Sequence, residues 1–169
     1  MKLDLTRLRE VHPLLPESTA AELVHRAALA LQRRHRPGVE LTATVDGMVT
    51  TGTITWTECS PTDVEQLDRH RVTEDGAEAV ALSLAHAERG WTVRRRLQRG
   101  EHADWLLRDE RHGLVALEIS GTDDGDDAVR LQEKLAQVLR NDDATQRAAC
   151  VVRFREPRAT LKLVPEALR

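Results

Sequence analysis

The first half of the chain has one hydrophobic pattern with helical spacing, followed by two with the alternation of strands. In "STAAELVHRAALALQRRHR" (18–36) the apolar residues follow helical spacing, Ser18 or Thr19 can cap the first turn, and Pro37-Gly38 ends the run. The runs "VELTATV" (39–45) and "MVTTGTITWT" (48–57) then alternate polar and apolar positions across Asp46-Gly47. This half therefore predicts a helix followed by a β-hairpin.

The second half has a more regular order of elements. A helical pattern over 74–90, ended by Gly90, precedes three strand patterns, a second helix and a nearly unbroken apolar strand. A last strand follows Pro157 and suits a sheet edge. The order helix, three strands, helix, strand predicts an α/β (α+β) fold with an αβββαβ core and helices packed on a mixed sheet. The predicted segments are strands 91–97, 103–108 and 113–119, helix 127–141, and strands 148–154 and 159–164.

Between the halves lies the polar stretch "ECSPTDVEQLDRHRVTEDG" (58–76), which is the best candidate for a linker. The predicted organisation is an N-terminal helix-and-hairpin module (1–60), a linker (61–73) and the αβββαβ core (74–169). The 169 residues suffice for one domain with a small addition.

Two carboxylates are predicted to meet at one end of the sheet. Side chains alternate in strand 113–119, so Glu118 and Ser120 share one face. A hairpin turning near 109–112 sets Asp104, at the start of the preceding strand, beside Glu118. Mg²⁺ accepts one or two carboxylates and keeps several waters, so this pair would be a minimal magnesium site, and magnesium there would assist attack on a phosphodiester.

Over roughly residues 74–155 the chain resembles the PD-(D/E)XK nuclease (restriction-endonuclease-like) superfamily. The resemblance lies in the order of elements, in a Gly76-x-Glu78 helix ending at Gly90-Trp91, and in the strings "GEHADWLL" and "VALEIS". It implies that Asp104 and Glu118 are the metal-binding acids. It further implies that Glu78 is an accessory acid and that the Ile119 carbonyl is an additional metal ligand.

The sequence departs from the family pattern at position 120. The family places a lysine there to position or activate water and to stabilise negative charge, and Ser120 carries no charge. Some members move the lysine to the next helix, where Lys134 lies on the flank of the apolar face. It could reach inward from there, but a solvated lysine is the more common outcome for a flank position. Gln132, on the other flank, is the polar substitute used in some branches.

Each acid also has an ordinary structural explanation. Glu118 would be a strand-end carboxylate, Asp104 a turn residue, and Glu78 a first-turn acid favoured by the helix dipole. Against this reading for Glu118, the run before it looks buried, and burying a lone carboxylate is costly.

The charge distribution limits how the chain would bind nucleic acid. The formal net charge is −3, so binding would depend on a local patch and not on a global basic field. The run "RRRLQR" supplies such a patch, and solvated arginines paired to nearby acids are the alternative. The candidate nucleic-acid contacts are Arg94, Arg95, Arg96 and Arg99.

Other signals concern location. The two cysteines, Cys59 and Cys150, form no CxxC pair, the first 18 residues lack a signal-peptide run, and no window approaches a membrane span. We expect a cytoplasmic protein with no membrane association.

Two functions remain. The favoured one is a non-catalytic or weakly active nuclease-fold protein that binds a protein or nucleic-acid partner, or forms a homodimer. The alternative is a Mg²⁺-dependent nuclease acting on DNA or RNA, with Asp104 and Glu118 as ligands and Lys134 or Gln132 assisting the water. A role in prokaryotic defence would fit either, and no residue selects it.

Overall fold

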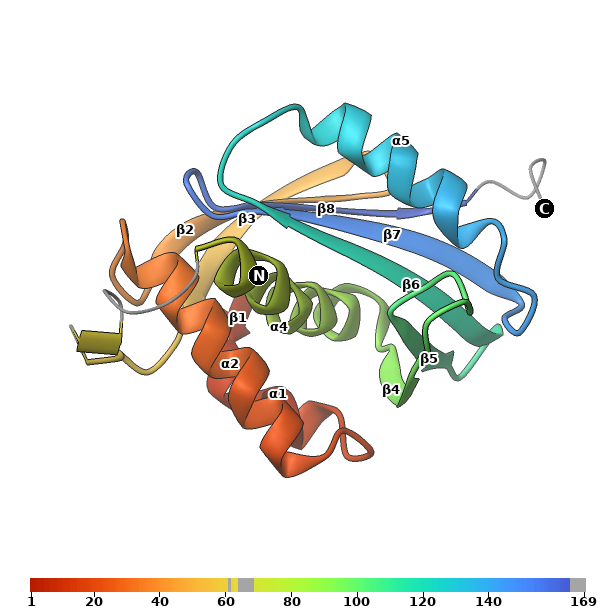
Figure 1. Ribbon diagram of the computed structural model, residues 1–169, viewed down its shortest axis with the longest axis horizontal. Coiled ribbons are helices and arrows are strands. Elements are labelled where there is room, and N and C mark those ends of the chain that lie inside the picture. Colours follow the sequence, from red (N-terminus) through yellow and green to blue (C-terminus); the bar gives the residue numbers. More distant parts are fainter. Residues whose placement is uncertain (61, 64–68, 165–169) are drawn as a thin grey trace.

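In a computed structural model, which describes residues 1–60, 62–63 and 69–164, the strands form one mixed eight-stranded sheet (Figure 1). The strand order is β1-β3-β2-β8-β7-β6-β5-β4. Helices α2 and α4 lie on one face of the sheet, and α5 lies on the other. The strands are β1 (Lys2–Asp4), β2 (Val39–Val45), β3 (Met48–Thr55), β4 (Thr92–Arg96), β5 (Trp105–Asp109), β6 (Gly113–Thr122), β7 (Gln146–Arg153) and β8 (Arg158–Leu163).

The predicted αβββαβ order is confirmed. Helix α4 (Arg69–Arg89) is followed by β4, β5 and β6, then by α5 (Asp127–Val138) and β7. The β4-β5-β6 meander is antiparallel, and β6 pairs with β7 in parallel through the α5 crossover. The α+β class with a mixed sheet is therefore correct, while α4 begins earlier and α5 ends earlier than predicted.

The N-terminal helix and hairpin are also present. A short 3₁₀ turn, η1 (Leu5–Arg7), and the one-turn α1 (Leu8–Val11) lead to α2 (Glu17–Gln32). Strands β2 and β3 pair in antiparallel register across Asp46 and Gly47, which have φ values of 48° and 88°. Both residues lie in the left-handed region that a two-residue hairpin turn requires.

The predicted N-terminal module (1–60) and the predicted core (74–169) contribute strands to one sheet. Strand β2 pairs in parallel with β8, so the hairpin belongs to the same sheet as the αβββαβ elements. Helix α2 packs on α4, and one hydrophobic cluster includes residues from both halves. Of the predicted linker (61–73), residues 61 and 64–68 lie outside the described residues, and 69–73 are already part of α4.

Two glycines allow α4 to approach its neighbours closely. A Cβ on Gly76 would lie 2.9 Å from the Cα of Ala27 in α2. A Cβ on Gly121 of β6 would collide with the backbone carbonyl of Thr73 in α4. Because both contacts are made by backbone, α4 lies tightly between α2 and β6, which fixes Glu78 near the end of β6.

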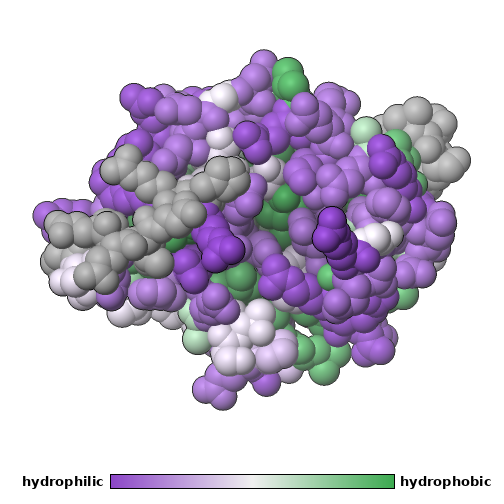
Figure 2. Space-filling view, viewed as in Figure 1, coloured by the Kyte–Doolittle hydropathy of each residue, from purple (hydrophilic) through white to green (hydrophobic). Residues whose placement is uncertain are grey.

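Exposed hydrophobic residues are scattered. The face in Figure 2 is mainly hydrophilic, with hydrophobic residues in small separate areas. The large apolar side chains that are exposed are Leu14, the adjacent Met48 and Val49 at the start of β3, and Val129 in α5.

A buried histidine joins the N-terminal segment to the sheet. His12 has no exposed surface, and its Nε2 lies 3.2 Å from the Leu82 carbonyl. Its Nδ1 accepts a hydrogen bond from the Val93 backbone N–H. The ring is therefore neutral with the proton on Nε2, and burial lowers the pKa of His12 to about 4.

This shift predicts a pH-dependent stability. A pKa depressed from about 6.5 to about 4 gives stability that is fully present above pH 6.5 and is lost as the pH falls toward 4. The loss is about 3 kcal/mol for a shift of this size. Glu78, whose pKa burial raises to about 7, acts in the opposite direction over an overlapping range. The measurement is therefore the difference in urea-unfolding free energy between wild type and His12→Leu from pH 7.5 to 4, which should shrink as the pH falls. A constant difference would contradict it.

Candidate active site

Strand β6 presents Glu118 and Ser120 toward α5, as the alternation predicted. Val115, Leu117 and Ile119 belong to the cluster on the α4 side of the sheet, whereas Ala116 packs with Leu131 and Leu135 of α5. Glu118 is 2% exposed and Ser120 is 6% exposed. A buried carboxylate at this position requires a partner on α5 or in the sheet.

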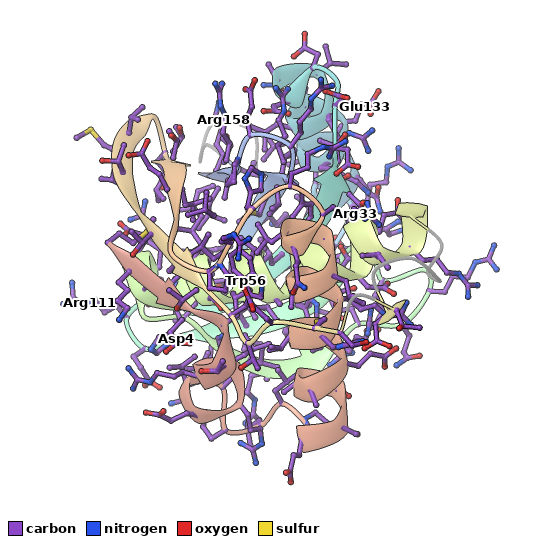
Figure 3. The ribbon with its side chains drawn as sticks, turned by 90° about the vertical axis from the view of Figure 1, so that its left-hand side faces the viewer. Asp4, Arg33, Trp56, Arg111, Glu133 and Arg158 are labelled. Carbon is purple, nitrogen blue, oxygen red and sulfur yellow. The ribbon has the colours of Figure 1, made fainter. Side chains whose placement is uncertain are left out.

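Helix α5 is held in place at its start and along one face. The Asp126 side chain caps the helix by accepting hydrogen bonds from the N–H groups of Ala128 and Val129. Leu131, Leu135 and Val138 are buried against the sheet. The exposed Glu133 points away from the molecule (Figure 3).

Lys134 reaches inward to Glu118. Its Nζ lies 2.6 Å from Glu118 Oε1, and the lysine side chain keeps 25% of its surface exposed. Burial and the neighbouring Asp104 raise the pKa of Glu118, and the Lys134 ammonium lowers it. The second oxygen, Oε2, is buried and has no hydrogen-bond partner among the residues that the structure describes. The predicted flank position of Lys134 thus brings it to the acid and not into solvent.

A second cation, which the sequence reasoning missed, lies at the substituted motif position. Arg130 Nη1 donates a hydrogen bond of 3.0 Å to Ser120 Oγ. Arg130 and Lys134 are four residues apart on α5, and so lie above Ser120 and Glu118, which are two apart on β6. The sequence signal for this contact was that a spacing of four residues on the helix matches a spacing of two residues on the strand.

Asp104 lies beside β6 just before β5 begins. Its Oδ2 accepts a 2.7 Å hydrogen bond from the Ile119 N–H, and its own N–H donates to the Leu117 carbonyl. Burial raises the pKa of Asp104, whereas the Ile119 N–H and Lys134 lower it. The N–H and C=O of one strand residue point toward the same neighbour, so the Ile119 carbonyl faces the Asp104 side.

Glu78 is near Asp104, but both its oxygens have partners. Oε1 accepts from Arg96 at 2.6 Å, and Oε2 accepts from the Trp105 indole at 2.8 Å. Burial raises the pKa of Glu78 to about 7, with a further contribution from Asp104. Arg96 also lies over the Trp105 ring. Glu78 therefore anchors β4 and β5 to α4.

The remaining candidates lie outside this group. Gln132 is exposed on α5. All four arginines of the predicted patch are exposed, but Arg95 pairs with Glu101 at 2.7 Å and Arg96 pairs with Glu78. Within the described ranges no acid pairs with Arg94 or Arg99, so these two contribute most of the remaining positive charge of this patch.

The site has the donors for a hard cation, although few of them. Among the described residues, no group of three or more His, Cys, Asp or Glu side chains is arranged to hold a metal ion. Asp104, the unpartnered Oε2 of Glu118 and the Ile119 carbonyl are oxygen donors, the kind that Mg²⁺ prefers.

Comparison with protein families, curated proteins and solved structures gave no match. Within the described ranges, no helix combines the length and the hydrophobicity needed to cross a membrane.

Proposed function

We propose that the chain is a metal-dependent nuclease of the PD-(D/E)XK type whose lysine comes from α5. The observation that carries this proposal is the 2.6 Å contact between Lys134 Nζ and Glu118 Oε1, next to Asp104. The αβββαβ order and the antiparallel meander that ends at Glu118 support it.

Asp104 and Glu118 would hold the metal, with the Ile119 carbonyl as a further donor. Magnesium there would stabilise negative charge on a phosphodiester and supply a more acidic water. The Ile119 N–H fixes one oxygen of Asp104, and Lys134 fixes one oxygen of Glu118. In each carboxylate one oxygen is therefore held in place, which limits the rotation of the group and so the position of its second oxygen.

Lys134 would take over the electrostatic role that Ser120 cannot perform. Its ammonium is partly buried and already oriented, so it would interact with developing negative charge without reorganising. Its remaining exposed surface leaves a route for a phosphate group to approach.

The substrate class would be DNA or RNA bound through local arginines, because the net charge of −3 gives no general attraction. A cytoplasmic location remains a prediction.

The proposal is tested by incubating the protein with single- and double-stranded DNA and RNA, in Mg²⁺, in Mn²⁺ and in EDTA. We expect metal-dependent cleavage of at least one substrate. Calorimetric titration with Mn²⁺ should show binding that Asp104→Asn weakens. If no substrate is cleaved and no metal binds, the nuclease proposal is wrong.

The second candidate is a non-catalytic relative that binds a protein or nucleic-acid partner, or a second copy. It is favoured by the mutual neutralisation of Lys134 and Glu118 and by the uncharged Ser120 at the motif position. This function predicts a stable complex that persists in Glu118→Gln. Loss of the complex together with loss of metal binding would contradict it.

A further inference from the structure

Arg130 has a different kind of partner from most arginines near the two ends of α5. Its hydrogen bond goes to a neutral hydroxyl, Ser120 Oγ, and no carboxylate pairs with it in the described part of the chain. The neighbouring arginines are largely neutralised by acids. These pairs are Arg33 and Arg34 with Asp123, Arg95 with Glu101, Arg153 with Asp127, and Arg155 with Asp124.

The position of Arg130 is set by the same two elements that carry the candidate active site. Arg130 precedes Lys134 by four residues, a rise of about 6 Å along a helix. Ser120 follows Glu118 by two residues, a rise of about 7 Å along a strand. The guanidinium therefore lies one step along β6 from the Glu118–Lys134 pair.

The chemistry of this group suits a phosphate. A guanidinium has five N–H donors in a rigid plane, and the hydroxyl of Ser120 occupies one of them. Because a hydroxyl does not cancel the charge, the half-buried Arg130 keeps its full attraction for an anion. Ser120 itself is buried, so it fixes the direction of the side chain.

We propose that Arg130, oriented by Ser120, binds a phosphate group adjacent to the one attacked at Asp104, Glu118 and Lys134. The substrate would then be a polynucleotide, with a phosphate flanking the cleaved bond, and not an isolated phosphodiester. The part of this inference that concerns the attacked phosphate rests on the proposed nuclease function. The contact between Arg130 and its own phosphate can be measured without cleavage.

The first test measures binding of a fluorescent oligonucleotide in EDTA, as a function of salt. Arg130→Gln should weaken binding about tenfold, the loss of one charge-assisted hydrogen bond. It should also lower the slope of log K against log salt by about 0.7 to 0.9, the value of one phosphate contact. Arg130→Lys should keep the slope, and Ser120→Ala should weaken binding less than Arg130→Gln. The matched control is Arg111→Gln, an exposed arginine remote from α5 (Figure 3).

The second test compares kcat/KM for an oligonucleotide with that for bis(4-nitrophenyl) phosphate, which has no flanking phosphate. Arg130→Gln should lower the ratio of the two about tenfold, mainly through KM for the oligonucleotide. An unchanged salt slope in Arg130→Gln overturns the inference, and so does an unchanged ratio. If the wild type cleaves neither compound but the slope still falls, the phosphate contact stands and the nuclease function fails. Thermal melting identifies any variant that has unfolded, and Arg130→Ala then replaces Arg130→Gln, because it also removes the charge.

Discussion

Glu118→Gln is expected to reduce metal-dependent nucleic-acid cleavage by at least about a hundredfold, while the protein stays folded. Glutamine keeps an oxygen for Lys134 but removes the charge that would hold the metal. Because burial disfavours the charged form of Glu118, and Lys134 keeps a quarter of its surface exposed to water, the loss of charge should leave the protein folded. The measurement is the initial rate of oligonucleotide cleavage in Mg²⁺, with the melting temperature taken on the same sample.

Glu133→Gln is the matched control, because it removes an acid from the exposed side of α5 close to the site in sequence. It should leave the cleavage rate unchanged. Equal rates for wild type and Glu118→Gln would show that this carboxylate holds no catalytic metal.

Lys134→Met is expected to destabilise the protein by about 3 kcal/mol at pH 8, because it leaves a buried carboxylate without its cation. It should also abolish cleavage, since the site then has no ammonium. Urea unfolding gives the stability, and the double variant Glu118→Gln/Lys134→Met should recover most of the loss. An uncompensated loss in the double variant would show that Lys134 stabilises the fold by packing alone.

The cost of Lys134→Met should depend on pH. Burial already raises the pKa of Glu118 above its ordinary value, and Lys134 opposes that rise. Without the ammonium the pKa of Glu118 rises further, so the acid binds a proton at low pH and the unpaired charge disappears. We expect the destabilisation to be small near pH 5 and to grow as the pH rises to 8. A cost that is the same at both pH values would argue against an electrostatic origin.

The placement of the site residues on β6 could be predicted from the sequence, because the alternation of side chains along a strand is strictly local. Two-residue periodicity was enough to place Glu118 and Ser120 on one face. The β5–β6 turn was enough to bring Asp104 to the end of β6, where it accepts the Ile119 N–H. Both inferences need only neighbouring strands and a short connection.

The side chains that α5 contributes to the site could not be predicted from the sequence, because their direction depends on how far the helix is rotated about its axis. Lys134 on a flank can reach either solvent or the sheet, and the difference is a small rotation that the packing of Leu131 and Leu135 decides. Arg130 was missed for the same reason. Its contact with Ser120 exists only once α5 is docked on β6.

The pairing that joins the two halves in one sheet was not predicted, because it is made between residues far apart in the sequence. Thr42 of β2 lies beside Arg158 of β8. Neither strand carries a local signal for that partner, because a hydrophobic alternation fits any edge of suitable length. The polar stretch between the halves looked like a domain linker for that reason.

The place of β8 in the sheet has a consequence for biosynthesis. It is the last of the described strands to leave the ribosome, yet it lies between β2 and β7, in the interior of the sheet. Until β8 emerges, the β2 edge and the β7 edge both remain open, and the sheet exists as two incomplete parts. The nascent chain therefore exposes the unpaired edge of β2 for most of its synthesis, and that of β7 only for the short interval before β8 follows. Open edges of this kind are prone to aggregation and to chaperone binding.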